Sequence, residues 1–254
     1  SRGALMPLSG TSEIASLLES APHMSNLKTE PLEIHRADVL HLMFEIDSAP
    51  MLALLPPSLH PTIPPTVTFV IWRCPDGPAG PFSLAQFRVG CRAGVRPRGI
   101  PLASYCDSPE ATEPLRSRWA FNCRPGSVQL RQMHDRVVGR VESGGREILR
   151  VELIDPEYIS GADVQYTANM NLAQVERDGG VKPRLVQIDP EYTFYKAQRG
   201  RPQILNFDRA AWNAEGVEPV YPVAATMASC DITLPRLRYI MDPDLPALQG
   251  TETI

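Results

Sequence analysis

Lysine is nearly absent from this sequence of 254 residues. Only Lys28, Lys182 and Lys196 occur, and arginine carries almost all of the positive charge. A guanidinium stays protonated near neutral pH, so it is not a practical nucleophile for forming an imine with a ketone. Chemistry that requires a lysine amine is therefore restricted to three positions.

Long apolar runs are missing as well. No stretch approaches the roughly 18 apolar residues that a membrane-spanning helix needs. Within residues 1–26 the short apolar stretch contains Glu13 and Glu19, so no secretory leader is predicted. We expect a cytoplasmic protein that does not bind membranes.

Paired cysteines and the common catalytic motifs are also lacking. The cysteines are widely spaced without a CxxC pair, and the histidines are scattered, which suits neither a disulfide framework nor a zinc site. The patterns GxGxxG, GxxxxGK[ST], HExxH and GxSxG do not occur, so nucleotide, zinc-protease and α/β-hydrolase sites lack their usual residues. We expect no metal and no cofactor.

What is present fits one globular domain. The hydrophobic content of 43% can fill a single core at this length. The net charge of -4 argues against nucleic acid as a general partner, because a negative field does not favour it. We predict an N-terminal arm over residues 1–26, with one helical turn near residues 14–18, and a single domain over residues 27–254.

Short segments rich in β-branched and aromatic residues predict strands along most of the chain. Clear examples are TVTFVIWRC, FSLAQFRVGCRA, GIPLASYCD, SVQLRQMHDRVVGRVE, REILRVELID and SCDITLPRLRYIMD. One helix is predicted to begin at a Ser108 cap with Pro109 in its first position, although Pro114 could kink it. The pattern favours a mainly β protein with few helices, either a large antiparallel barrel or a sandwich.

The pentapeptide IDPEY occurs twice, at residues 154–158 and 188–192. We interpret both copies as strand ends that enter Asp-Pro turns, and not as a catalytic pair of carboxylates.

The most informative stretch is GPFSLAQFRVGCRAGVRPRGIPLASYCDSPEATEPLRSRWAFNCRPG. It resembles the centre of the acetoacetate decarboxylase family, in which a strand pair, an aspartate turn and a helix precede a small-aromatic-Pro-Lys-Lys-x-Gly segment. Here that segment is residues 120–126, where Ala120, Phe121 and Gly126 keep the small, aromatic and glycine positions. The resemblance extends over roughly residues 30–242 and implies an antiparallel β-barrel or cone with flanking helices, a buried pocket and a homo-oligomer.

The two catalytic lysine positions of the family are occupied here by Cys123 and Arg124. In the family, one lysine forms an imine with a β-keto acid and the second cation lowers its pKa. A cysteine cannot form that imine. The resemblance also places Ser83 or Gln86, together with Val70, opposite the glutamates of the family's pocket.

Arginines are the first candidates for ligand binding. Arg124, with Arg36 and Arg118, could hold a carboxylate or enolate through charge-assisted hydrogen bonds. Arg36 lies within one residue of the substrate-binding arginine of the family. The alternative is that these arginines pair with surface acids or face water.

Other candidates each have an alternative role. Cys123 could be a nucleophile if Arg124 lowers its pKa, or a small buried residue. Gln86 and Asn122 could polarise a carbonyl, or satisfy buried backbone groups. The aromatic residues that would line the cavity, or belong to the core, are Tyr105, Trp119 and Phe121.

Three functional hypotheses follow. The first is an enzyme of small-molecule or secondary metabolism that acts on a keto acid or related enolisable compound without a Schiff base, with lyase, hydratase and hydrolase outcomes open. The second is a catalytically silent protein that binds a small carboxylate. The third is a decarboxylase with a displaced amine, for which Lys196 is the candidate.

Overall fold

The computed structural model describes residues 8–77 and 79–254, in which sixteen strands form one sheet. The strands of the first half are β1 (His23–Met24), β2 (Leu32–Glu45), β3 (His60–Pro61), β4 (Thr66–Cys74), β5 (Phe82–Ala93), β6 (Arg96–Cys106), β7 (Cys123–Pro125) and β8 (Ser127–Gln132). Those of the second half are β9 (Arg136–Ser143), β10 (Arg146–Ile159), β11 (Ala168–Arg177), β12 (Gly180–Ile188), β13 (Glu191–Phe207), β14 (Tyr221–Leu234), β15 (Tyr239–Met241) and β16 (Thr251–Thr253).

Helices are short and few. They are α1 (Ile14–Leu17), α2 (Ser48–Leu54), α3 (Pro109–Trp119) and α4 (Ala247–Gly250), with 3-10 turns η1 (Leu18–Ser20) and η2 (Gly161–Asp163). The prediction of a mainly β protein with few helices is confirmed. Among the described residues, none of the helices has the length and apolar character needed to cross a bilayer.

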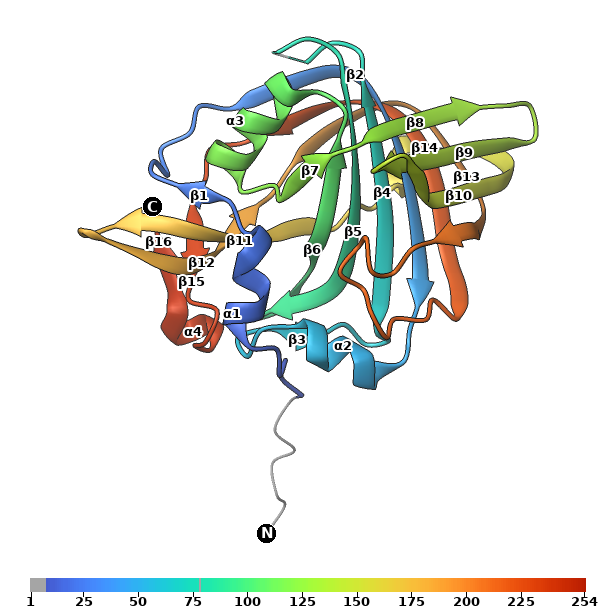
Figure 1. Ribbon diagram of the computed structural model, residues 1–254. Helices are drawn as coiled ribbons and strands as arrows, with labels where there is room; N and C mark the ends of the chain where they lie inside the picture. The colour runs from blue at the N-terminus through green and yellow to red at the C-terminus, as the bar shows by residue number, and fades with distance from the viewer. Residues whose placement is uncertain (1–7, 78) are drawn as a thin grey trace.

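The sheet runs in the order β16-β15-β12-β11-β6-β5-β4-β2-β14-β13-β10-β9-β8. Most neighbours are antiparallel, but β6 pairs in parallel with both β7 and β11, and β1 pairs in parallel with β11. Figure 1 shows the strands curled around an interior, with α3 at one end and α2 at the other. Within the described chain the end strands β8 and β16 do not pair, so the sheet is strongly curved but open and does not form a closed barrel.

Two hydrophobic clusters fill the interior, and β4 lies between them. Phe69 and Ile71 point into one cluster, which includes Phe87 of β5, whereas Val70 and Trp72 point into the other. Successive residues of a strand face opposite sides, so a strand buried on both faces contributes to two clusters. The same alternation places Gln86, beside Val70, on the Trp72 side of the sheet.

Helix α3 confirms its predicted start. Ser108 Oγ accepts a hydrogen bond from the backbone N–H of Ala111 at 3.2 Å, and Pro109 occupies the first turn. The helix ends where Ala120 adopts a left-handed conformation with φ 57°. Arg116 Nη1 then donates to the Cys123 carbonyl at 2.9 Å, which fixes the segment that follows.

The two IDPEY copies differ in structure. The second behaves as predicted, because β12 ends at Ile188 and β13 begins at Glu191. The prediction for the first copy was wrong. Residues 154–158 stay within β10 and form a β-bulge there. The bulge shows as a register shift between Ile154 and Glu157 and as a positive φ of 53° at Asp155.

The described part of the predicted N-terminal arm is hydrogen-bonded to the rest of the chain. Backbone N–H groups of Gly10 and Ser12 donate to the carbonyls of Leu59 and Leu55, both at 2.9 Å. Gln174 donates to the Pro22 carbonyl at 2.8 Å. Residues 1–7 lie outside the described residues, and the domain boundary near residue 26 stays a prediction.

Candidate functional site

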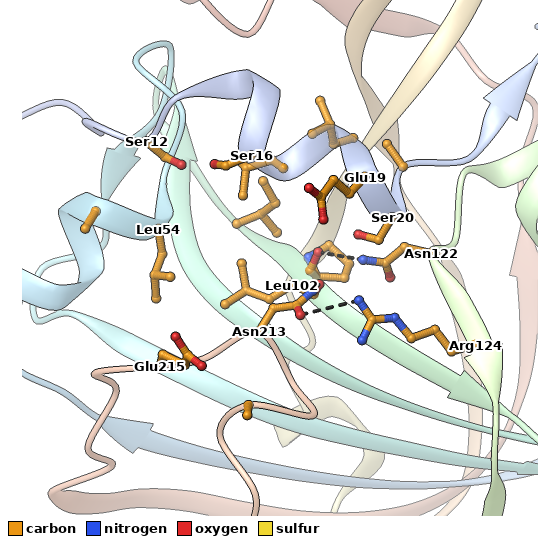
Figure 2. Close-up of a pocket in the computed structure, with 17 residues that line it drawn as sticks. Ser12, Ser16, Glu19, Ser20, Leu54, Leu102, Asn122, Arg124, Asn213 and Glu215 are labelled. Atoms are coloured by element: carbon orange, nitrogen blue, oxygen red, sulfur yellow. Dashed lines mark hydrogen bonds between the residues drawn. The ribbon is translucent and has the colours of Figure 1, made fainter. Parts of the chain in front are cut away.

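Two hollows border the segment 122–124 and Gln86, which were singled out in the sequence. The larger of the two, which we call the outer pocket, has a volume of about 460 Å³. It is lined by residues of α1 and η1, α2, β6 and the loop 210–215, together with Asn122 and Arg124. The smaller, the inner cavity, has about 10 Å³ of free space and lies between β2, β4, β5 and β11. Figure 2 shows the outer pocket with Arg124 and Asn122 on one side and Glu215 on the other.

Arg124 extends into the outer pocket and is only loosely engaged there. Its Nη1 and Nη2 contact the Ala211 carbonyl and Asn213 Oδ1, each at 3.4 Å. Both acceptors are neutral, and no ion pair to Arg124 occurs among residues 8–77 and 79–254. The guanidinium is therefore free to form charge-assisted bonds with an anionic ligand.

Asn122 is held in a fixed orientation at the wall of the same pocket. Its Oδ1 accepts from Ser104 Oγ at 2.7 Å, and its Nδ2 donates to the Pro101 carbonyl at 3.2 Å. The two bonds use groups on β6, which runs parallel to β7. Asn122 and Arg124 are two residues apart on an extended segment, so their side chains lie on the same side and border the same pocket.

Cys123 lies between them and faces the opposite way. The thiol is 3% exposed and belongs to the cluster that contains Trp72 and Cys106. Burial raises the pKa of Cys123 well above its usual value, with the neighbouring Cys106 adding to the effect. The alternation of the strand directs the Cys123 and Arg124 side chains to different sides, so the condition on which a nucleophilic Cys123 depended, a pKa lowered by Arg124, finds no support, and the alternative of a small buried residue is favoured.

Gln86 lines the inner cavity and not the outer pocket. Its Nε2 donates to Ser104 Oγ at 3.1 Å, and its Oε1 accepts from Asn169 Nδ2 at 3.3 Å. Since Ser104 in turn donates to Asn122, a continuous chain of buried hydrogen bonds joins the inner cavity to the outer pocket.

The same cavity holds an arginine that sequence reasoning missed. Arg88 of β5 is buried and donates to Thr68, Thr167 and Asn169. Its Nη2 also lies 3.3 Å from His41 Nε2. Burial, and secondarily the charge of Arg88, lowers the pKa of His41 to about 3, so this imidazole is neutral.

Other predicted ligand-binding arginines lie elsewhere. Arg36, with φ 54°, borders a separate open hollow beside His35 and Asp231, and its backbone N–H donates to Asp231 Oδ1 at 2.9 Å. Arg118 is exposed on α3. The structure therefore does not bring Arg36, Arg118 and Arg124 together.

The three aromatic candidates are parts of the core. Tyr105 packs edge-on against Trp212 and donates from its hydroxyl to the Ala211 carbonyl at 2.6 Å. Phe121 packs near Trp72, and Trp119 is fully buried in the same cluster. The two contacts of Tyr105 hold the loop 210–215 against β6.

All three lysines are exposed. Lys28 precedes β2, Lys182 lies on β12, and Lys196 lies on β13 with its Nζ 5.1 Å from the ring centroid of Tyr158. None of them lines the outer pocket or the inner cavity. Among the described residues, no group of three His, Cys, Asp or Glu side chains is arranged to hold a metal ion.

Some of the missed residues had a signal in the sequence and others had none. Arg88 follows Gln86 by two positions in FSLAQFRVG, and period-two alternation places both on one face of a strand. Asn213, Glu19 and Glu215 line the outer pocket from segments without any local pattern that links them to Arg124.

Comparison with known proteins now places the chain. Its sequence matches the model of the acetoacetate decarboxylase (ADC) family over residues 19–243. The chain belongs to the acetoacetate decarboxylase family. No curated protein sequence matches the chain.

Several solved structures share the fold at low sequence identity. An acetoacetate decarboxylase structure superposes with a TM-score of 0.70 at 18% identity, covering 83% of this chain and 89% of that one. The acetoacetate decarboxylase from Legionella pneumophila gives 0.68 at 17% identity, covering 93% and 96%. The enduracididine biosynthesis enzyme MppR complexed with pyruvate gives 0.64 at 15% identity, covering 84% and 92%.

Proposed function

We propose that this member of the ADC family is an enzyme that acts on a small keto acid or related enolisable compound without a Schiff-base lysine. The observation that carries the proposal is the placement of Arg124, which lines a pocket of about 460 Å³ and, among the described residues, hydrogen-bonds only to neutral acceptors. The relative MppR has been solved with pyruvate, a keto acid of the proposed class.

Binding is proposed to be non-covalent. Arg124 would hold the carboxylate through two parallel N–H donors, and a polar edge of the ligand would meet the amide of Asn122 or Asn213. Cys123 and Arg124 stand at the positions that the family resemblance assigns to the lysine pair. An exposed Lys196 outside both hollows offers no substitute amine there.

Proton transfer in the proposed reaction would use a carboxylate of the same pocket. Glu19 and Glu215 both line it, from the N-terminal segment and from the loop 210–215. Removal of a proton next to a ketone requires a base within hydrogen-bond reach and stabilisation of the developing enolate. Arg124 supplies the positive charge for that enolate.

A second candidate function is a catalytically silent protein that binds a small carboxylate. The inner cavity favours it, because the hollow beside Gln86, Val70 and Trp72 is small and no lysine or glutamate is among the described residues that line it. On this alternative the outer pocket keeps its binding role and performs no chemistry.

A proton-NMR time course in D₂O separates the two candidates. The purified protein is incubated with a panel of α- and β-keto acids, beside a sample without protein and the Arg124→Ala variant. Exchange of the protons next to the ketone, or appearance of product, in the wild type but not in Arg124→Ala supports the enzyme. The matched control is Arg96→Ala, which removes an exposed arginine at the start of β6 and should behave as wild type.

Binding of a keto acid without exchange or product over many hours would favour the silent binding protein. Turnover that survives in Arg124→Ala would contradict the role given to that residue. Treatment with borohydride in the presence of the turned-over compound should leave Lys28, Lys182 and Lys196 unmodified. A reduced adduct on any of them would show that a Schiff base forms after all.

A further inference from the structure

The outer pocket carries more negative than positive charge. Among the described residues that line it, Arg124 is the only cation, whereas Glu19 and Glu215 each contribute a carboxylate. Both glutamates are exposed, and within residues 8–77 and 79–254 neither forms an ion pair. By contrast Glu218, just beyond the loop 210–215, pairs with Arg209. A simple keto acid would add another negative charge to a pocket that already has an excess of it.

The reaction proposed above needs only one of these carboxylates as a base. Glu215 lies across the pocket from Arg124 (Figure 2), so it is the carboxylate that the far end of an Arg124-bound ligand would meet. A carboxylate attracts a positive group and repels a second anion, and both effects are stronger in a pocket than in open water. The surplus carboxylate therefore favours a ligand whose far end is positively charged.

A buried hydroxyl borders the same pocket. Ser12 is 9% exposed, and within the described chain its Oγ forms no hydrogen bond, although its backbone N–H donates to the Leu55 carbonyl at 2.9 Å. Buried polar groups in native proteins almost always have a partner. Figure 2 shows Ser12 on the side of the pocket away from Arg124. Its oxygen is thus a second acceptor for a polar group at the far end of a ligand.

The space between the polar groups is lined by apolar side chains. They include Leu17, Leu54, Ile100, Leu102 and Leu172, and Figure 2 shows Leu102 between Arg124 and Leu54. The volume of about 460 Å³ falls within the range of roughly 300–1,000 Å³ in which proteins bind drug-sized ligands, so a compound as small as pyruvate would fill only part of it. The pocket therefore accommodates an aliphatic chain between two polar ends.

We propose that the substrate of the outer pocket is a keto acid with an aliphatic chain that ends in a positively charged group, of the amine or guanidine class. Arg124 would bind its carboxylate, and Glu215 with Ser12 would receive its cationic end. The leucines would contact the chain. This inference rests on the proposed function and narrows its substrate class from simple keto acids to zwitterionic ones.

Two keto acids of the same shape test the charge alone. In one, the chain ends in a trimethylammonium group, which cannot cyclise onto the ketone as a free amine can, and in the other it ends in a tert-butyl group. Their affinities are measured by isothermal titration calorimetry over a series of chain lengths. At the best chain length the wild type should bind the cationic compound about five times more tightly, as expected for a partly exposed ion pair. Equal affinities would overturn the inference.

Glu215→Gln isolates the carboxylate that is assigned to the cation. This variant should bind the two compounds about equally, because affinity for the cationic compound falls while affinity for the tert-butyl compound is kept or rises. Retained binding of the tert-butyl compound also reports that the variant is folded. Glu13→Gln removes an exposed carboxylate that does not line the pocket and should keep the preference of the wild type. An unchanged preference in Glu215→Gln would overturn the proposal.

Failure of this inference is distinguishable from failure of the proposed function. Arg124-dependent turnover of keto acids, together with equal binding of the charged and uncharged compounds, would leave the proposed function standing and show that the cation preference is wrong. Absence of both binding and turnover with every keto acid would show that both are wrong.

Discussion

Cys123 and Arg124 are adjacent in the chain, yet their side chains meet different surroundings. The thiol is packed beside Cys106 in the core, whereas the guanidinium borders the outer pocket. A thiol whose pKa is raised by burial is a poor nucleophile, because the thiolate is the reactive form. At the residue scale, ligand binding therefore depends on the arginine.

We predict that Cys123 is unreactive in the folded protein. All five cysteines are free and buried, so a thiol reagent should label the native protein slowly and the urea-unfolded protein at all five positions. Cys123→Ala should change the native labelling rate little. Rapid labelling of Cys123 in the native protein, found by peptide mass mapping, would contradict its burial.

A second residue-scale prediction concerns His41 and pH. The pKa of His41 is about 3 in the folded protein and 6.5 for the free group. Between these pH values the imidazole is protonated in the unfolded chain and neutral in the folded protein. The free energy of unfolding should therefore rise with pH between about 3 and 6.5, and fall as pH is lowered through that window.

The measurement is urea unfolding at a series of pH values for His41→Gln, which keeps an acceptor for Arg88 but does not titrate. Between pH 4 and 6 the free energy of unfolding of His41→Gln should rise less steeply with pH than that of the wild type. The difference in slope should correspond to about one proton taken up on unfolding. An unaltered slope in His41→Gln would mean that His41 is protonated in the folded state.

Individual elements were largely predictable from local patterns. The strands β4 and β5 have the predicted bounds because β-branched and aromatic runs are closed by turn residues at both ends. Helix α3 follows its Ser-Pro start despite Pro114 in its interior. The first IDPEY copy was mispredicted because a bulge within a long strand produces the same local sequence as a turn.

The Ser108 cap gives an element-scale prediction. Ser108→Ala removes the acceptor for the Ala111 N–H and should lower the free energy of unfolding by about 1 kcal/mol. Ser117→Ala, within the same helix, is the control and should have little effect in urea unfolding. Equal stability of Ser108→Ala and the wild type would show that the cap bond does not contribute.

At the scale of the whole molecule, the outer pocket is assembled from segments far apart in the sequence. The N-terminal segment, the end of α2, β6 and the loop 210–215 each contribute one wall. Arg124 and Asn122 could be named from the sequence because they lie in the segment that resembles the family motif. Glu19 and Asn213 could not be named, since only the folded sheet brings their segments to Arg124.

The N-terminal wall can be tested by filling the pocket. Ser16 lines it from α1, so Ser16→Trp should abolish keto-acid binding while leaving the unfolding midpoint nearly unchanged. Ala15→Trp places the same side chain at an exposed neighbouring position and should bind as wild type. Normal binding by Ser16→Trp would indicate that ligands use another hollow.

The most direct test of the central claim is an NMR titration of the arginine Nε–H signals with α- and β-keto acids. The Arg124 signal is assigned as the one missing from the Arg124→Gln variant. The account predicts that this signal shifts saturably with the compound that binds and that binding is lost in Arg124→Gln. Saturable binding that leaves the Arg124 signal unmoved and persists in the variant would contradict it.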